Sequence, residues 1–210
     1  MGGGGSKAAF GSAIGTSPQG VVAHSSHYRS MRLADVARMS SYRDGHYCGV
    51  KWQCVEYARR WLLQVHGVTF ASVGMAYEIF DLPEFYRPGT SDGGAPTPVR
   101  VQRYRDGEAP TAQRSDGDSS AAPQVGDVLL WHPQGHFART GHVAIVVAVG
   151  ADSETDGLTI ALGEQNVTDA SWKGLPFSRQ LRVTRRGAAF AIEDPLPGAK
   201  VLGWVRPVLQ

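Results

Sequence analysis

Cysteine is scarce in this 210-residue sequence, long apolar runs are missing, and neither sign of charge dominates. Two cysteines are too few for a disulfide scaffold and favour a reducing compartment, the cytoplasm. The longest apolar run, 143–149, is far shorter than the about 18 residues that indicate a membrane-spanning helix. The formal net charge is only +2 and the arginines are dispersed, so we expect no nucleic-acid partner. These absences favour a cytoplasmic enzyme with one hydrophobic core.

The clearest predicted element is a helix that begins at Cys54 and stops at Gly67. Its apolar residues recur at spacings of three and four, namely Val55, Ala58, Trp61, Leu62 and Val65. Cys54 would therefore stand at the helix N-terminus, where free backbone N–H groups and the positive end of the helix dipole stabilise a thiolate. Because the thiolate is the nucleophilic form of cysteine, Cys54 is the candidate nucleophile.

Two later segments supply partners for this cysteine. His142 opens an apolar run, 142–149, that is typical of a buried strand. Imidazole has the pKa needed to accept and return a proton at neutral pH, which makes His142 the candidate base. A second strand, about 158–162, leads to Glu164, whose carboxylate can orient the imidazole and stabilise its protonated form. The chain order of cysteine, histidine and acid is the papain-like one.

The remaining pattern predicts an α+β fold in which a helical N-terminal half packs on an antiparallel sheet. The strands expected in that sheet cover 127–131, 142–149, 158–162, a hairpin near 180–192 and a closing strand at 201–205. Residues 88–124 are rich in Gly, Pro, Ser, Asp and Thr, so we interpret them as a long surface insertion with a short edge strand at 99–105. A plain loop and a lid over the active site are equally compatible with this insertion.

Residues 1–9 are interpreted as a flexible glycine-rich tail ahead of a domain that covers 10–210. Gly2 followed by Ser6 fits an N-myristoylation signal, although a cloning linker has the same composition. A single myristoyl chain gives only weak, reversible membrane attachment. We therefore expect a cytoplasmic protein, which associates with membranes only if Gly2 is acylated.

Other residues allow competing interpretations. Cys48 has no helix directly after it, so we interpret it as structural, the alternative being a disulfide with Cys54 that switches the enzyme off. Three histidines lie within 132–142, but a proline and a glycine interrupt the segment, so no metal site is expected: His132, His136 and His142. Four carboxylates could attract a polyamine cation, although such groups are more often solvated or capping: Asp44, Glu56, Glu78 and Asp81.

Several motifs, in a fixed order along nearly the whole chain, carry a family resemblance. They are Phe10-Gly11, segment 51–60 (KWQCVEYARR), segment 73–80 (VGMAYEIF), segment 140–145 (TGHVAI), segment 164–167 (EQNV) and Leu202-Gly203-Trp204. On these residues the sequence resembles the amidase domain of the bifunctional glutathionylspermidine and trypanothione synthetase/amidases, a branch of the CHAP cysteine amidohydrolase/peptidase family.

The resemblance implies a papain-like (CHAP) fold and a role for each matched residue. Cys54 would be the nucleophile, His142 the base and then the acid, and Glu164 the group that orients His142. The residues that line the site for the glutathionyl group would be Gln53, Val55, Glu56, Tyr57, Arg59, Val73, Gly74, Met75, Ala76 and Asn166.

Physical reasoning is compatible with these assignments. Arg59 can pair with the glycine carboxylate of glutathione, and Gly74 lets the backbone approach a peptide-like ligand closely. Gln53 and Asn166 stay ambiguous, because either amide can donate to an oxyanion alongside the Cys54 backbone N–H or simply bind substrate.

The function implied is hydrolysis of the amide between the glycine of glutathione and a spermidine amine, with neither metal nor organic cofactor. The bifunctional relatives carry an ATP-grasp ligase after the amidase. No phosphate-binding glycine loop is found in this sequence, so we expect hydrolysis and not ligation, unless the chain is a fragment of a longer protein.

Three alternative functions remain open. The first is a peptidoglycan-cleaving CHAP amidase or endopeptidase of the D-alanyl-glycyl type, which the lack of a signal peptide disfavours. The second is a non-catalytic module that binds thiol–polyamine conjugates. The third is a membrane-tethered interaction module that depends on the N-terminal tail.

Overall fold

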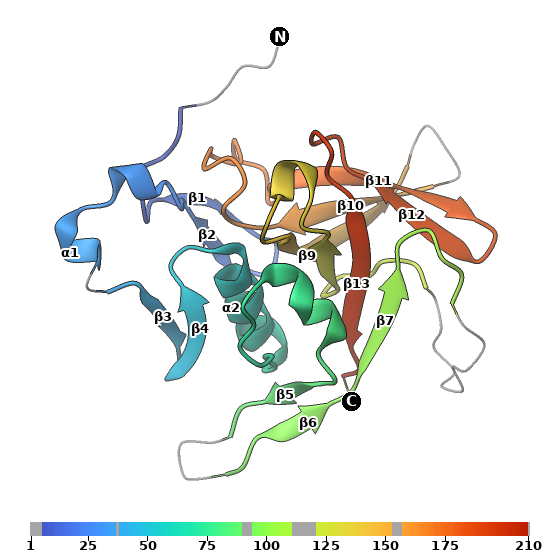
Figure 1. Ribbon diagram of the computed structural model, residues 1–210, viewed down its shortest axis with the longest axis horizontal. Helices are drawn as coiled ribbons and strands as arrows, with labels where there is room; N and C mark the ends of the chain where they lie inside the picture. The colour runs from blue at the N-terminus through green and yellow to red at the C-terminus, as the bar shows by residue number, and fades with distance from the viewer. Residues whose placement is uncertain (1–5, 37, 90–93, 111–120, 153–156, 210) are drawn as a thin grey trace.

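A seven-stranded antiparallel sheet occupies most of the C-terminal half of the chain (Figure 1). The computed structural model describes residues 6–36, 38–89, 94–110, 121–152 and 157–209. The strands of the sheet are β7 Val101–Arg105, β8 Val128–Trp131, β9 His142–Ala151, β10 Leu158–Gly163, β11 Arg179–Arg186, β12 Ala189–Glu193 and β13 Val201–Pro207. Across the sheet they follow the order β12, β11, β10, β9, β8, β13 and β7. The strands predicted between 127 and 205 coincide with β8 to β13, so the prediction of an antiparallel α+β fold is confirmed.

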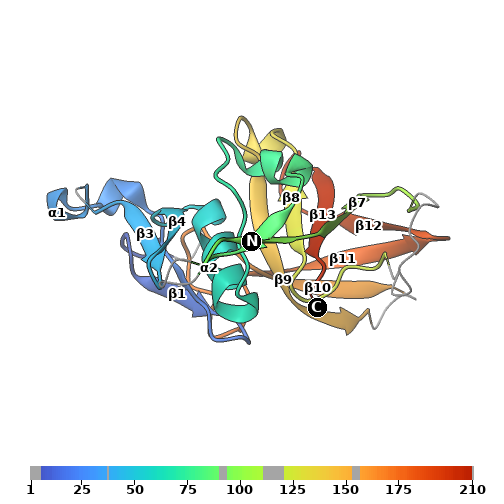
Figure 2. The ribbon, with the colours of Figure 1, turned by 90° about the horizontal axis from the view of Figure 1, so that it is seen from below.

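The N-terminal half is not predominantly helical, and that part of the prediction was wrong. It contains short strands as well as helices: β1 Ala13–Thr16, β2 Val22–His24, α1 Leu33–Val36, β3 Ser40–Arg43, β4 His46–Val50, α2 Cys54–His66 and β5 Phe85–Arg87, the last paired with β6 Thr97–Val99. Short 3-10 helices cover Tyr28–Ser30, Ala76–Asp81 and Gly135–Phe137. In Figure 2, α2 lies between the β1 to β4 hairpins and the large sheet.

The short hairpins escaped prediction because distant residues hold them. The N–H of Trp172 donates to the Ile14 carbonyl in β1 at 2.7 Å, and the N–H of His24 in β2 donates to the Gln165 side chain at 2.8 Å. Strands of three to five residues also carry too few side chains for an alternating pattern to stand out.

Helix α2 begins and ends where the apolar periodicity predicts. Gly67 follows the helix in the left-handed conformation (φ 63°), and its N–H bonds carbonyls of the last turn, an arrangement that glycine adopts without strain. The buried face of the helix consists of Tyr57, Ala58, Trp61 and Leu62. Each large apolar side chain buried in this way contributes about 1.5–3 kcal/mol, so packing against the sheet holds α2 in place.

Both faces of the sheet are buried. Along β9, Val143, Ile145 and Val147 pack on the side of α2, whereas Ala144 and Val146 belong to a second core on the opposite side. This alternation is the period of two that a strand imposes on its side chains.

The second core is enclosed because the sheet curls until its two edges meet. The N–H of Gly107, just after edge strand β7, donates to the Phe190 carbonyl of edge strand β12 at 2.8 Å. The N–H of Ile192 in β12 donates in return to Asp106 Oδ1, also at 2.8 Å. The curl therefore shields one face of the sheet, over which the described residues place no α-helix.

Parts of the predicted tail and insertion lie outside the described residues. These are 1–5, including the lipidation candidate Gly2, and 90–93 and 111–120 of the segment 88–124. The described part of that segment includes β6 and β7, and β7 is paired with β13 at the sheet edge. Within the described ranges, no helix is both long enough and apolar enough to cross a bilayer.

Substitution of Gly163 tests how closely α2 packs on β10. A Cβ at this position would lie 2.5 Å from the Tyr57 hydroxyl and 2.8 Å from a methyl of Val147. We expect Gly163→Ala to lower the free energy of unfolding by about 1–3 kcal/mol, because over-packing forces buried neighbours apart. Gly150→Ala on β9 is the control, since its Cβ would meet only Thr159 Oγ1 at 3.3 Å. Urea unfolding measures both, and equal destabilisation of the two variants would contradict this packing.

Candidate active site

A cleft of about 810 Å³ opens beside the N-terminus of α2, between the loop before the 3-10 helix Ala76–Asp81 and the loop that leads into β9. Most of the predicted site residues line it: Gln53, Cys54, Val55, Arg59, Val73, Gly74, Met75, Ala76, His142 and Asn166. It is also lined by residues that the sequence did not single out, among them Tyr47, Val50, Ser72, Phe137 and Thr140. The cleft thus joins segments that lie far apart in the chain.

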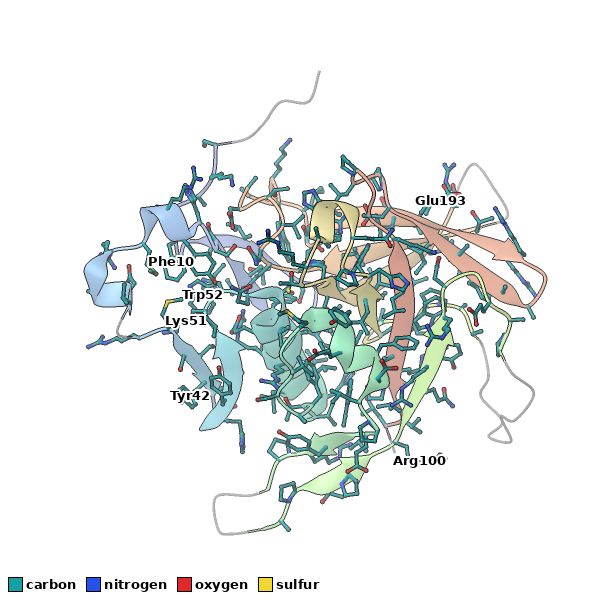
Figure 3. All side chains as sticks on the ribbon, in the orientation of Figure 1. Phe10, Tyr42, Lys51, Trp52, Arg100 and Glu193 are labelled. Atoms are coloured by element: carbon teal, nitrogen blue, oxygen red, sulfur yellow. The ribbon has the colours of Figure 1, made fainter. Side chains whose placement is uncertain are left out.

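Cys54 is the first residue of α2, so the segment before the helix decides where its thiol lies. Trp52 in that segment stacks on His24 of β2, with ring centroids 4.0 Å apart. Figure 3 shows Trp52 and Lys51 on the side of the molecule that carries β3 and β4. The hairpins therefore anchor the approach to the helix, and Cys54 is left 8% exposed at the cleft.

The surroundings of Cys54 favour its thiolate. Burial alone would raise the pKa of the thiol. The charge and hydrogen bond of the neighbouring His142 imidazole, together with the backbone N–H groups of Val143 and Val55, instead lower this pKa below its ordinary value. The arrangement therefore favours a thiolate beside a protonated imidazole.

His142 is the first residue of β9 and is almost fully buried. Its Nε2 lies 2.8 Å from Glu164 Oε2, which leaves Nδ1 as the ring nitrogen for Cys54. Phe137 stacks on the imidazole at 4.4 Å between ring centroids, and Trp131 packs at 5.3 Å. Burial alone would lower the pKa of His142, but the Cys54 thiolate and then Glu164 raise it to about 9.

Glu164 directly follows β10 and is buried. Its carboxylate has three hydrogen-bonding partners. Its Oε1 accepts hydrogen bonds from Ser178 Oγ at 3.0 Å and Arg179 Nε at 2.6 Å, and its Oε2 faces His142. Burial would raise the pKa of this carboxyl, but Arg179 and then His142 hold it well below its usual range. Ser178 and Arg179 were not predicted, since nothing local in the sequence marks them.

The amides of Gln53 and Asn166 are joined to each other. Asn166 Nδ2 donates to Gln53 Oε1 at 2.8 Å, and Asn166 Oδ1 accepts from Ser26 Oγ at 2.8 Å. With its oxygen engaged in this way, Gln53 still has amide N–H groups that can donate to a ligand in the cleft. Asn166, with both ends of its amide engaged, serves to orient Gln53.

Glu56 and Tyr57 were expected to contact the ligand, and the structure corrects this. Both are fully buried and neither lines the cleft. Glu56 accepts from Arg60 Nε at 2.7 Å and Ser41 Oγ at 2.8 Å, while Tyr57 packs beneath β10. Successive helical residues are rotated by about 100°, so Val55 and Arg59, which are four residues apart, share one face of α2. Glu56 and Tyr57 are rotated away from that face.

Arg59 lies in the cleft as a buried cation, with 3% of its surface exposed. Its guanidinium sits over the Phe70 ring at 4.9 Å, and its buried Nε has no hydrogen-bond partner. Among the described residues no carboxylate pairs with it, and burial lowers its pKa. The cleft therefore presents a positive charge that an anionic ligand group could neutralise.

The wall of the cleft opposite α2 is held by Glu78. Its Oε2 accepts the N–H groups of Gly74 at 2.8 Å and Met75 at 3.1 Å, so this carboxylate is not offered to a polyamine. Asp44 pairs with Arg43 at the surface. Within the described residues, no group of three or more His, Cys, Asp or Glu side chains is arranged to hold a metal ion.

Residues 45–166 of the chain match the CHAP domain family. The chain is 35% identical over 202 residues to the bifunctional glutathionylspermidine synthetase/amidase of Escherichia coli (strain K12), a match that covers 94% of this chain and 29% of that protein. It is 33% identical over 214 residues to the glutathionylspermidine synthase of Crithidia fasciculata and 28% identical over 199 residues to its trypanothione synthetase. Each of these matches covers 93% of this chain and 26% of the relative, so the chain spans less than a third of these relatives' lengths.

The two cysteines should differ sharply in reactivity. Cys48 is a free, fully buried thiol, and burial raises its pKa to about 11, whereas the pKa of Cys54 is lowered. We expect iodoacetamide to alkylate Cys54 alone in the folded protein, even well below pH 8, because its thiolate persists there. The thiolate should lose its imidazolium partner as the pH rises through about 9, the pKa of His142.

Peptide mapping by mass spectrometry measures this selectivity. His142→Ala should slow the alkylation of Cys54 at pH 6 by about tenfold or more. Without the imidazolium the pKa of Cys54 rises, and each unit of that rise lowers the thiolate fraction about tenfold. Modification of Cys48 at the same rate as Cys54 would contradict the electrostatics described above.

Proposed function

Since the chain belongs to the CHAP domain family, we propose that it is a cysteine amidase that cleaves the bond between the glycine of glutathione and a spermidine amine. Family membership supports an amide hydrolase, and the names of the relatives point to glutathione–polyamine conjugates. The observation that carries the proposal is the cleft itself. It combines a thiol beside a buried imidazole–carboxylate pair with an unpaired arginine one helical turn away.

In the first half of the proposed reaction, the Cys54 thiolate attacks the glycine carbonyl carbon, and the carbonyl oxygen becomes an oxyanion. The Cys54 backbone N–H at the start of α2 and an N–H of the Gln53 amide are the available donors. One well-placed donor contributes about 3 kcal/mol to such a transition state. The His142 imidazolium then gives its proton to the spermidine nitrogen, the C–N bond breaks, and a thioester with Cys54 remains.

In the second half, His142 is neutral and accepts a proton from water, whose oxygen attacks the thioester carbonyl. The C–S bond breaks, glutathione leaves with a free glycine carboxylate, and the proton on His142 restores the ion pair with Cys54. Glu164 keeps the imidazole in one orientation throughout, because its hydrogen bond is to Nε2 and leaves Nδ1 free for both transfers.

Arg59 is proposed to bind a carboxylate of the substrate, but not that of the glycine. In the conjugate the glycine carboxyl group is the acyl part of the bond to be cut and carries no charge. The glutathionyl group then retains one carboxylate, the α-carboxylate of its γ-glutamyl residue. Arg59 can pair with this group during binding and with the glycine carboxylate only once it has been released.

Hydrolysis is tested by offering glutathionylspermidine, trypanothione and a peptidoglycan digest separately to the purified protein. We expect release of glutathione and spermidine by the wild type and the Cys48→Ala control, because Cys48 lies outside the cleft. Cys54→Ala and His142→Ala should fold normally and lose about 10⁴-fold or more of the rate, since they remove the nucleophile or its acid and base. Product analysis by mass spectrometry decides the outcome. Full turnover by Cys54→Ala would overturn the mechanism, and cleavage of peptidoglycan alone would change the substrate.

The role of Arg59 is tested by a pair of substrates. Arg59→Gln should lower kcat/KM for glutathionylspermidine by about 10- to 100-fold, the value of a charge-assisted hydrogen bond, mostly through KM. With cysteinylglycyl-spermidine, which lacks the γ-glutamyl carboxylate, the same substitution should change kcat/KM little. An equal loss with both substrates would show that Arg59 serves the structure of the cleft instead. Arg43→Gln at the surface is the control for a generic loss of charge.

A further inference from the structure

A chain of alternating charges continues beyond Glu164 into the second core of the sheet. Arg179 at the start of β11 forms a fork with Glu164, Nε to Oε1 at 2.6 Å and Nη2 to Oε2 at 3.2 Å. Its remaining nitrogen, Nη1, donates to both oxygens of Asp194 at 2.9 and 3.0 Å. The side chains of Glu164 and Asp194 are each only 1% exposed. Arg179 is thus a cation whose side chain is 15% exposed, clamped between two buried carboxylates.

Asp194 anchors this clamp to the wall of the imidazole pocket. It follows β12, next to Glu193, which Figure 3 labels near the end of that strand. Asp194 Oδ2 accepts the indole N–H of Trp131 at 2.8 Å, and Asp194 Oδ1 accepts the N–H of Leu196 at 2.8 Å. The Trp131 ring in turn packs on His142 at 5.3 Å. Four strands, β8, β10, β11 and β12, therefore converge on the support of one imidazole.

The charge of Glu164 makes such support necessary. Papain-like proteases share the chain order of nucleophile, base and orienting group, but their orienting group is a neutral amide, whereas the group in this chain is a carboxylate. A buried carboxylate without a counter-charge tends to take up a proton. If it stays ionised, it binds the imidazolium so tightly that proton transfer to a leaving group becomes slower. A guanidinium that holds both oxygens turns the carboxylate into part of a nearly neutral pair, which still accepts the hydrogen bond from His142.

We propose that Arg179 is a positioning residue for the reaction: it neutralises the buried Glu164 carboxylate and, tethered by Asp194, fixes which oxygen faces His142. The proposal rests on the roles proposed above for Cys54, His142 and Glu164. Arg179 does not line the cleft, and its bonds to the site are those to Glu164, with Asp194 and the Trp131 ring, 5.6 Å away, as its other neighbours.

The groups that face Glu164 come from three elements. His142 belongs to β9, Arg179 to β11 and Tyr57 to α2. The charge of Glu164 contributes to raising the pKa of the buried Tyr57 hydroxyl. Ser178 adds a neutral donor. Burial would raise the pKa of Glu164, and Arg179 does most to oppose this, ahead of His142. Without Arg179, Glu164 should therefore take up a proton at a higher pH, and the imidazolium should lose its anionic support as this occurs.

The test measures the rate of Cys54 alkylation by iodoacetamide as a function of pH, which requires no substrate. In Arg179→Gln we expect the acid limb of this profile to move to higher pH by about one unit or more, so that the rate at a given pH on that limb falls about tenfold. Arg206→Gln is the matched control, because Arg206 forms a similar buried fork with Asp127, at 2.8 Å for both bonds, in a part of the sheet away from His142. It should lose comparable stability and leave the profile unchanged.

Two further variants separate a positioning role from a structural one. In a Glu164→Gln background, Arg179→Gln should shift the profile no further, because the charge through which Arg179 acts is already gone. Arg179→Lys keeps the charge but cannot serve both carboxylates with a planar fork, so it should shift the profile in the same direction by less. If Arg179→Gln does not fold, the profile of Arg179→Lys alone tests the positioning role of Arg179.

An unchanged profile in Arg179→Gln or Arg179→Lys, an equal shift in Arg206→Gln, or an additive shift in the Glu164→Gln background would overturn the proposal. The readout does not depend on the amide that the protein cleaves. If the alkylation profile shifts as expected while glutathionylspermidine is not hydrolysed, the positioning role of Arg179 stands and the proposed substrate fails. If hydrolysis is observed and the profile does not shift, the proposed substrate stands and the positioning role of Arg179 fails.

Discussion

The hydrogen bond between His142 and Glu164 is the interaction on which the rest of the site depends. The two residues are 22 positions apart, and they meet because β9 and β10 are antiparallel, so the start of one strand lies near the end of the other. Helix α2 packs across the same strands and brings Cys54 to the free side of the imidazole. The fold thus converts one strand pairing and one helix contact into a fixed order of thiol, imidazole and carboxylate.

Charge is treated in two different ways around the cleft. On one side the charges alternate from Cys54 through His142, Glu164 and Arg179 to Asp194, so each buried ion has a partner of opposite sign. On the other side Arg59 is equally buried but has no carboxylate among the described residues. A buried cation without a counter-ion is unfavourable in the empty protein. An anionic group of a ligand beside Arg59 would offset this cost, and in the proposed function the substrate supplies that group.

The sequence predicts the elements whose signals are local and fails where the contacts are distant. Helix α2 and the strands from β8 to β13 follow from apolar periodicity, and Cys54, His142 and Glu164 stand at element ends that this periodicity locates. The clamp around Glu164 could not be predicted, since Arg179 is one arginine among several in an exposed-looking strand and Asp194 lies in a loop. The pairing of β11 with β10 and β12 places Arg179 beside Glu164 and Asp194, and the curl of the sheet brings Asp194 to Trp131 of β8. Neither strand pairing nor curl leaves a mark in any single segment.

The failure at Glu56 shows what a contiguous motif can and cannot specify. Residues 53–57 and Arg59 were expected to line one ligand site, but the helix divides the segment 53–60 between two faces. Gln53, Cys54 and Arg59 line the cleft, whereas Glu56 and Arg60 turn inward and bond Gln165, whose Nε2 also donates to the Gln53 carbonyl at 3.3 Å. The inward pair therefore fixes the backbone that carries the outward residues. In the proposed reaction, motif residues of this kind act through the geometry of the N-terminus of α2 and do not contact the substrate.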